Sequence, residues 1–216
     1  MFETTTVQIE KSKTKQRYFT VQEYLEMEEL SDINHEYDNG KLIPMAGGTP
    51  VHSKIKGLII TTLNNGIRTS KEQYDVFNSD IRIHLPELNR NVMPDGAVVV
   101  GKPVFTIENP VGLLANPTLI VEVFSKSSEG YDRGEKFKRY RTLPSLMEYM
   151  LVSQDKPLVE TFVKKENRWF INEVAEGLDV SIKLVSLGFS ILLSDIYWGV
   201  KFEEKKAKKA TAKKSD

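Results

Sequence analysis

Apolar residues recur at helical spacing in two long stretches of the chain. Between His52 and Thr69 they fall every three or four residues and form one broad face, made of Ile55, Leu58, Ile59, Leu63 and Ile67. A second helix is predicted from Tyr131 to Thr142. A shorter helix is predicted from Thr20 to Glu29, because Thr20 and Glu23 match a capping box that satisfies the free amides of a first helical turn.

Short apolar or alternating runs between Gly, Pro and Asn clusters predict strands. The runs Gly96–Val100 and Leu119–Phe124 are apolar almost throughout, which is typical of strands covered on both faces, so we expect them to be neighbours in one sheet. Asn39-Gly40 predicts a tight hairpin. The remaining predicted strands are His35–Asp38, Lys41–Met45, Tyr74–Asn78, Ile81–Leu85, Glu148–Ser153, Leu158–Lys164, Arg168–Val174 and Asp179–Leu184.

The order of these elements predicts the fold class. Strand 119–124, helix 131–142 and strand 148–153 have the spacing of a crossover unit, which joins two parallel strands. We therefore expect an α/β (α+β) fold with a mixed central sheet flanked by helices and additional antiparallel C-terminal strands. A single domain is expected over residues 18–202, between a flexible segment at 1–17 and a Lys-rich, disordered tail at 203–216.

The composition of the chain excludes several kinds of functional site. The 216 residues include no Cys, which excludes disulfides, thiolate zinc sites and Cys nucleophiles. Basic and acidic residues number 30 each, but residues 203–216 hold six Lys against three acids, so the rest of the chain carries a net charge of −3. Nucleic-acid contacts must then come from local patches. Because no apolar run is long enough to span a membrane, we expect no membrane partner and a cytoplasmic location.

Two carboxylates stand in unusual surroundings. Glu122 interrupts an apolar strand, where an unpaired charge is costly, so it needs a cation, hydrogen-bond donors or an open cleft. An edge strand open to water is the alternative. Asp95 opens the neighbouring predicted strand, although Pro-Asp-Gly alone is a turn signal. Two acids at one end of a sheet are what a hard cation such as Mg²⁺ requires, with water in its other positions.

A polar stripe follows on the next predicted helix. Asp132, Lys136 and Tyr140 are spaced four residues apart and therefore lie on one helical face. Taken alone, such an Asp and Lys are an ordinary surface pair. Because the helix directly follows the strand that bears Glu122, Lys136 is also placed to reach the same cleft.

These residues together resemble a known family. Pro94-Asp95, Val121-Glu122-Val123 with Ser125, the segment from Tyr131 to Lys136 with Tyr140, and Glu148-Tyr149 look like the bacterial "putative restriction endonuclease" family of the PD-(D/E)XK nuclease superfamily. The resemblance extends upstream to the Thr20 capping box, to Glu36-Tyr37 and to His52, and so covers roughly residues 18–200.

The resemblance implies roles for individual residues. Asp95 is implied as the motif aspartate and Glu122 as the second acid, both ligands of Mg²⁺, with Mn²⁺ as a substitute. Phe124 stands where the superfamily usually keeps its lysine, so Lys136 is implied as the migrated catalytic lysine, and Lys138 is the weaker candidate. Glu36 is a further possible acid, although a hairpin glutamate can simply face solvent. Further possible accessory residues are Asp132, Tyr140 and Ser125.

The implied function is a metal-dependent endonuclease, a hydrolase that cleaves nucleic-acid phosphodiester bonds, with DNA as the expected substrate. A catalytically inactive binding module for nucleic acid or protein is the alternative, favoured by Phe124 and the acidic body; a glycosidase-like carboxylate pair ranks lowest. Because a duplex has two strands of opposite polarity, we expect a homodimer. The late aromatic residues are its candidate interface, although a position in the core is the more frequent explanation for such residues: Trp169, Phe170, Tyr197 and Trp198.

Overall fold

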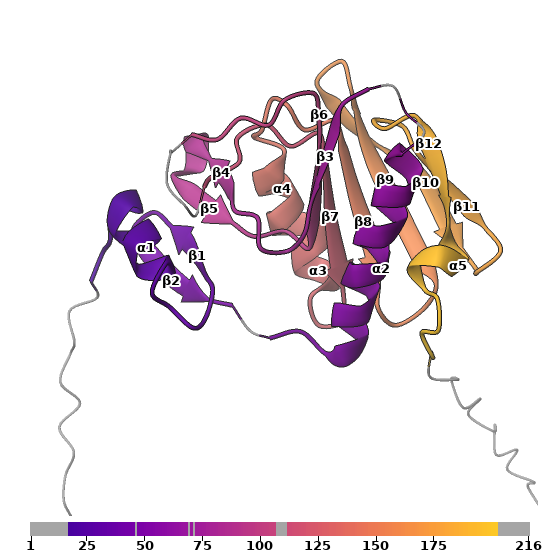
Figure 1. Ribbon diagram of the computed structural model, residues 1–216, viewed down its shortest axis with the longest axis horizontal. Helices are drawn as coiled ribbons and strands as arrows, with labels where there is room; N and C mark the ends of the chain where they lie inside the picture. The colour runs from indigo at the N-terminus through magenta and orange to yellow at the C-terminus, as the bar shows by residue number, and fades with distance from the viewer. Residues whose placement is uncertain (1–16, 46, 69, 71, 107–111, 203–216) are drawn as a thin grey trace, which may run out of the picture.

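A six-stranded sheet forms the centre of the computed structural model, which describes residues 17–45, 47–68, 70, 72–106 and 112–202 (Figure 1). The strand order is β10-β9-β8-β7-β6-β3. Strands β7 and β8 are parallel, and every other neighbouring pair is antiparallel. The sheet is thus mixed, as predicted. Its strands are β3 (Tyr74–Phe77), β6 (Gly96–Val100), β7 (Leu119–Phe124), β8 (Glu148–Ser153), β9 (Leu158–Lys165) and β10 (Arg168–Glu176).

Strand β7 shows why the central runs are apolar on both faces. All six of its residues are buried. Leu119, Val121 and Val123 point into the core on one side of the sheet, whereas Ile120 and Phe124 point into the core on the other side. The predicted neighbours β6 and β7 do pair, with Gly96 opposite Val121. A sheet covered on both faces therefore explains the composition of these strands.

Helix α2 (Pro50–Ile67) covers one face of the sheet through Ile55, Ile59 and Leu63. It begins two residues before the predicted start, and Thr49 caps it by accepting a hydrogen bond from the backbone N–H of His52 at 3.1 Å. The hairpin of β11 (Ser181–Leu184) and β12 (Phe189–Leu192) and helix α5 (Leu193–Ile196) pack on the same face (Figure 1).

The opposite face is covered by three consecutive helical turns, in place of the single helix predicted at 131–142. They are α3 (Glu129–Tyr131), the π-helical turn η2 (Asp132–Lys136) and α4 (Phe137–Tyr140). The ring of Phe137 stacks on Tyr149 of β8, with centroids 4.5 Å apart. A π-helical turn inside a helix is rare and often occurs at functional sites. Here it lies beside the central strand β7.

A second, four-stranded sheet has the order β2-β1-β5-β4 and packs with helix α1 (Val21–Glu28). The predicted capping box is present, since Glu23 and Thr20 bond each other's backbone N–H groups. The predicted tight turn is also present, with positive φ at Asn39 and Gly40. The strands are β1 (His35–Asp38), β2 (Lys41–Pro44), β4 (Ile83–Leu85) and β5 (Arg90–Val92), and η1 (Pro86–Leu88) lies between the last two.

Several boundaries and elements differ from the prediction. Strand β5 was not predicted, because it contains the polar residues Arg90 and Asn91. Both are buried in the structure, and an ion pair with Asp38 compensates the charge of Arg90. Strand β12 and helix α5 were not predicted; the helix follows the strand directly, with no Gly, Pro or Asn between them to mark a boundary. Strand β4 begins at Ile83, β10 extends to Glu176, and β11 begins at Ser181.

Other predictions concern residues at the ends of the described ranges. The flexible segment predicted at 1–17 falls outside the described residues except for Arg17, and so do Thr69, at the end of the predicted helix, and the predicted tail 203–216.

Of the candidate interface aromatics, Trp198 is 73% exposed and Phe170 is 49% exposed, but Tyr197 is buried and Trp169 is partly buried against Phe137. Within the described ranges, no helix combines the length and apolar character that a membrane span requires.

Candidate active site

Asp95 and Glu122 meet at one end of the central sheet. Gly96 of β6 pairs with Val121 of β7, so the residue before Gly96 lies beside the residue after Val121. The contact is direct, because the backbone N–H of Val123 donates a hydrogen bond to Asp95 Oδ2 at 2.7 Å. The antiparallel pairing of β6 with β7 therefore brings together two acids that are 27 positions apart in the sequence.

Asp95 faces two basic side chains of helix α2. His52 Nε2 lies 3.1 Å from Asp95 Oδ1, and Lys56 Nζ lies 3.5 Å from the same oxygen. Burial opposes ionisation of Asp95, but the hydrogen bond and charge of His52 and the charge of Lys136 outweigh it and lower the pKa of Asp95. Asp95 is therefore a carboxylate at neutral pH.

Glu122 lies deeper, and its side chain is almost fully buried on β7. The hydroxyl of Tyr140 donates to Glu122 Oε1 at 2.8 Å, and Lys136 Nζ lies 2.7 Å from Oε2. Burial raises the pKa of Glu122 to about 8, and the charge of Asp95 adds to that rise while Lys136 opposes it. The shifted pKa means that the neighbouring acids do not both ionise readily without an added cation.

Lys136 remains charged in these surroundings. Burial alone disfavours its ammonium group, but the carboxylates of Glu122 and Asp95 raise its pKa above the usual value. The raised pKa of Glu122 favours its neutral form, whereas the raised pKa of Lys136 favours its charged form. Lys136 is charged because the ionised carboxylate of Asp95 supplies a full negative charge close to its ammonium group.

The predicted stripe on the helix does face this site, despite the π-helical turn. Lys136 Nζ lies 3.9 Å from Asp132 Oδ1, and Tyr140 also reaches Glu122. Burial is the largest cause of the raised pKa of Asp132, and the charge of Asp95 contributes to it. Lys138, by contrast, is exposed on the outer surface and makes no ion pair with a described residue. The structure thus separates the two lysines.

Phe124 is a core residue in the place of the usual lysine. Its side chain is buried on the same face of β7 as Glu122, and Arg133 lies over its ring at 5.1 Å. Arg133 is itself fixed by ion pairs with Glu129 and Glu160. The cation nearest to Glu122 therefore comes from η2, through Lys136, and not from β7.

Of the remaining possible accessory residues, Glu36 lies near the acid site, whereas the hydroxyl of Ser125 is bonded elsewhere. Glu36 on β1 is half-buried, accepts a long hydrogen bond of 3.5 Å from the backbone N–H of Met93, and its charge contributes to the raised pKa of Lys136. Ser125 instead bonds Ser127 and Ser128 in the turn after β7. Within the described residues its hydroxyl makes no hydrogen bond to Asp95 or Glu122.

His52 and Lys56 were missed as site residues by the sequence reasoning. The sequence pattern includes His52 only as part of the family resemblance, without a role in the site, and does not include Lys56. A signal did exist, since the two polar residues are four positions apart on a helix whose other face is apolar, and so share one side of it. That side faces Asp95.

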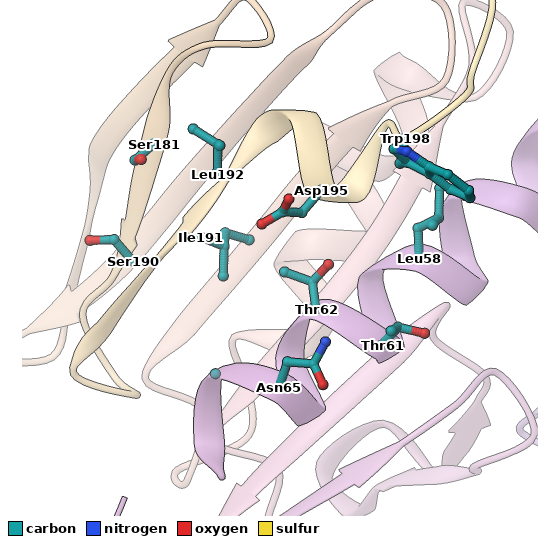
Figure 2. A pocket seen from close by; sticks show the side chains of 11 residues that line it. Leu58, Thr61, Thr62, Asn65, Ser181, Ser190, Ile191, Leu192, Asp195 and Trp198 are labelled. Atoms are coloured by element: carbon teal, nitrogen blue, oxygen red, sulfur yellow. The ribbon is translucent and has the colours of Figure 1, made fainter. Parts of the chain in front are cut away.

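A separate hollow lies elsewhere on α2, between its C-terminal half and the β11–β12 hairpin (Figure 2). It has a volume of about 530 Å³ and includes Thr62, Asn65, Asp195 and Trp198 in its lining. Asp195 is its one ionisable lining residue, so the hollow lacks the paired charges of the acid site. We therefore place the candidate chemistry at Asp95 and Glu122.

The donor set suits a hard cation more than zinc. No cluster of three or more His, Cys, Asp and Glu side chains arranged to hold a metal occurs in the described ranges. Asp95 and Glu122 offer two carboxylates beside each other, and Mg²⁺ is commonly held by one or two carboxylates together with water and substrate phosphate oxygens. Burial is the largest cause of the raised pKa of Glu122, and the charge of Asp95 adds to it, so a cation held by both carboxylates would offset their repulsion. The residues therefore fit Mg²⁺ or Mn²⁺.

The sequence is similar to one protein family and to two individual proteins. Residues 21–194 match the Uma2 family, described as "Putative restriction endonuclease". Two uncharacterized proteins of Synechocystis sp. are similar: one is 35% identical, over 79% of this chain and 96% of the relative, and the other is 31% identical, over 84% and 92%.

The fold also matches a solved structure. The crystal structure of a putative nuclease belonging to DUF820 from Anabaena variabilis superposes with a TM-score of 0.62 at 17% identity, covering 83% of this chain and 97% of the other. At that identity the match speaks for the fold alone. With residues 21–194 matching as well, the chain belongs to the Uma2 family of restriction-endonuclease-like proteins.

Proposed function

We propose that this protein is a metal-dependent endonuclease that hydrolyses phosphodiester bonds, with DNA as its substrate. The observation that carries the proposal is the convergence of Asp95, Glu122 and Lys136 at one end of the sheet. Membership of a family described as "Putative restriction endonuclease" supports the same reaction. The charge pattern suits a phosphodiester better than a sugar, because a glycosidase pair needs no lysine between its carboxylates.

Each residue has a distinct part in the proposed reaction. Asp95 and Glu122 would hold Mg²⁺, or Mn²⁺ in its place, and the bound ion would supply an activated water and charge neutralisation at the phosphate. Lys136 stabilises the negative charge that develops on the phosphate oxygens. Tyr140 orients the carboxylate of Glu122 through its hydrogen bond to Oε1.

His52 and Lys56 hold Asp95 from the side of α2. Their contacts with Oδ1 keep this carboxylate ionised and fix its position against the N–H of Val123. Lys56 is only partly exposed, and its ammonium group also adds positive potential at the mouth of the site. That potential offsets the mildly acidic character of the body where a phosphate would approach.

The test is cleavage of plasmid, single-stranded and duplex DNA by purified protein with Mg²⁺ or Mn²⁺. We expect nicking that EDTA abolishes and that Asp95→Asn lowers by at least about 100-fold, as is typical when a group that stabilises the transition state is lost. The exposed Asp80→Asn serves as the matched control and should keep full activity.

A nucleic-acid-binding module is the second candidate. It is favoured by the ion pair of Lys136 with Glu122, which already offsets buried charge without a metal. Binding of DNA without cleavage under every metal condition, unchanged by Asp95→Asn, would select this candidate over the nuclease.

We further propose a homodimer, because one site per chain cuts one strand of a duplex. The exposed Phe170 and Trp198 remain candidate contacts, whereas the buried Tyr197 is a core residue whose hydroxyl bonds the backbone of Ser153 and Leu158. Sedimentation velocity that detects only a monomer at every concentration would refute this arrangement.

A further inference from the structure

A hollow of about 470 Å³ lies at the carboxyl ends of the parallel strands β7 and β8, and β7 is the strand that also carries Glu122. This volume lies within the range of small-molecule sites, and the carboxyl ends of parallel strands are a frequent place for ligands. Four parts of the chain contribute to its lining: the start of α2, the turn after β7, the turn after β8 and the last described residues. Its lining includes Thr49, Phe124, Lys126, Gln154, Lys201 and Phe202.

The floor of the hollow is apolar and largely aromatic. Phe124 and Leu158 are buried there, and Phe202 packs edge-on against Tyr197 with ring centroids 5.3 Å apart. Val51, at the second position of α2, borders the hollow and is 38% exposed. Because Arg133 lies over the buried ring of Phe124, the partly exposed ring of Phe202 is the aromatic surface that a ligand can reach. This surface suits a flat, weakly polar ring system, because apolar and aromatic side chains bury the face of such a ring.

The rim carries positive charge. Lys126 and Lys201 form no ion pair with any residue in the described part of the chain, whereas Lys156 pairs with Glu176 at 3.0 Å. Of the two acids at the rim, Glu129 is already paired with Arg133 at 2.9 Å. The other, Asp155, accepts a hydrogen bond from the backbone N–H of Lys126, so the ammonium group of this lysine is not engaged by that bond. The rim therefore suits a phosphate.

Gln154 supplies the polar specificity that a nucleobase needs. Its Oε1 accepts a hydrogen bond from Thr49 Oγ1 at 3.3 Å, which orients the amide. Its Nε2 donates no hydrogen bond to any described residue, and so remains available to an acceptor on a ligand. Aromatic stacking surface, an amide donor and cationic groups are together the chemistry that recognises a nucleotide.

Two residues of the hollow, Phe124 and Thr49, link it to the acid pair. Phe124 follows Glu122 by two residues on β7, and Thr49 bonds the backbone of His52, which contacts Asp95. We propose that this hollow binds one unpaired nucleobase of the substrate strand, next to the phosphate to be cleaved, with Lys126 and Lys201 on the flanking phosphate. The inference rests on the proposed function and specifies its substrate class: a single strand, or a nucleotide flipped out of a duplex, because a stacked base cannot enter.

The experiment measures binding and cleavage separately. Binding is followed by fluorescence anisotropy in EDTA, with a labelled single-stranded oligonucleotide of about ten nucleotides and the same sugar-phosphate chain made abasic. Val51→Trp fills the hollow without touching Asp95, Glu122 or Lys136. Val174→Trp, at a 54% exposed position on β10, is the matched control. Lys201→Glu and Lys126→Glu are compared with Lys183→Glu on β11, which is remote from the hollow.

We expect the wild type to prefer the base-containing strand, and Val51→Trp to weaken its binding at least about fivefold, the lower end of the effect of losing one stacked base. The abasic strand should bind both proteins equally. Binding of the normal strand that is unchanged in Val51→Trp and in both rim variants overturns the inference, even if Mg²⁺-dependent cleavage is intact. Conversely, base-dependent binding that Val51→Trp removes supports the inference even if no metal supports cleavage, in which case only the nuclease proposal fails.

Discussion

Two buried glutamates on the neighbouring parallel strands β7 and β8 have very different partners. Glu122 contacts the ammonium group of Lys136 and the hydroxyl of Tyr140, and it lies beside the second acid Asp95. Glu148, at the start of β8, accepts hydrogen bonds from the backbone N–H of Val185 at 3.2 Å and from the N–H and hydroxyl of Ser186 at 2.8 and 2.7 Å. Burial raises the pKa of both carboxyl groups.

The difference teaches that burial of an acid does not by itself mark a reactive site. Three neutral donors from the turn between β11 and β12 satisfy Glu148, so this residue anchors the hairpin to the central sheet. Glu122 is held by a cation and stands next to another carboxylate, an arrangement that a bound metal ion and a phosphate would both change. Partners, and not depth, separate a structural glutamate from a candidate catalytic one.

The largest expected effect concerns the cation beside Glu122. Lys136→Ala should lower Mg²⁺-dependent nicking of DNA by about 100-fold or more, because it removes charge stabilisation from the transition state. Lys138→Ala, two residues further on the outer surface, should change the rate by less than about threefold. Initial rates on supercoiled plasmid measure both. Equal losses in the two variants would mean that a general basic surface, and not the Glu122 partner, is responsible.

The next effect tests the structural role of Glu148. Glu148→Ala should lower the free energy of unfolding by about 2 kcal/mol, because the turn at Val185 and Ser186 loses its buried acceptor. Glu122→Gln should cost less than this, since it removes one of two neighbouring acids and the charge of Asp95 still stabilises the ammonium group of Lys136. Urea unfolding followed by circular dichroism measures both variants. A Glu148→Ala protein as stable as wild type would remove the anchoring role.

The smallest effect is a pH dependence of stability. The pKa of Glu122 is raised in the folded protein, to about 8, so the folded state binds a proton that the unfolded state releases at lower pH. Its stabilising contribution is thus fully present below the unfolded pKa and declines as the pH rises through about 8. Between pH 7 and 8 the metal-free wild type should lose about 1 kcal/mol relative to Glu122→Gln. Thermal or urea unfolding without metal checks the difference; parallel curves would contradict the shifted pKa.

Asp95 should make stability depend on pH with the opposite sign, in the acidic range. Its folded-state pKa is lowered, so its contribution to stability is present above the unfolded pKa and declines as the pH falls through the folded value. Asp95→Asn should therefore flatten the acid side of the profile, and Glu122→Gln the alkaline side.

Local patterns predicted much of the fold. The apolar face at 52–69 formed α2, and the runs at 96–100 and 119–124 formed neighbouring core strands, because burial requires apolar side chains at those periodicities. The capping box at Thr20 and the turn at Asn39-Gly40 likewise depend on few neighbouring residues. By contrast, β5 was missed because its Arg90 is buried only through an ion pair with Asp38, 52 positions away.

The sequence by itself determined which residues could carry chemistry. Glu122 stood out because an acid in an apolar strand must find a partner, and the spacing of Asp132, Lys136 and Tyr140 placed them on one helical face. Only the tertiary structure decided which partners meet: the register of β6 against β7 set Asp95 beside Glu122, and α2 brought His52 and Lys56 to Asp95 from more than 35 positions away. Such contacts depend on how separate elements pack, and no local periodicity records that packing.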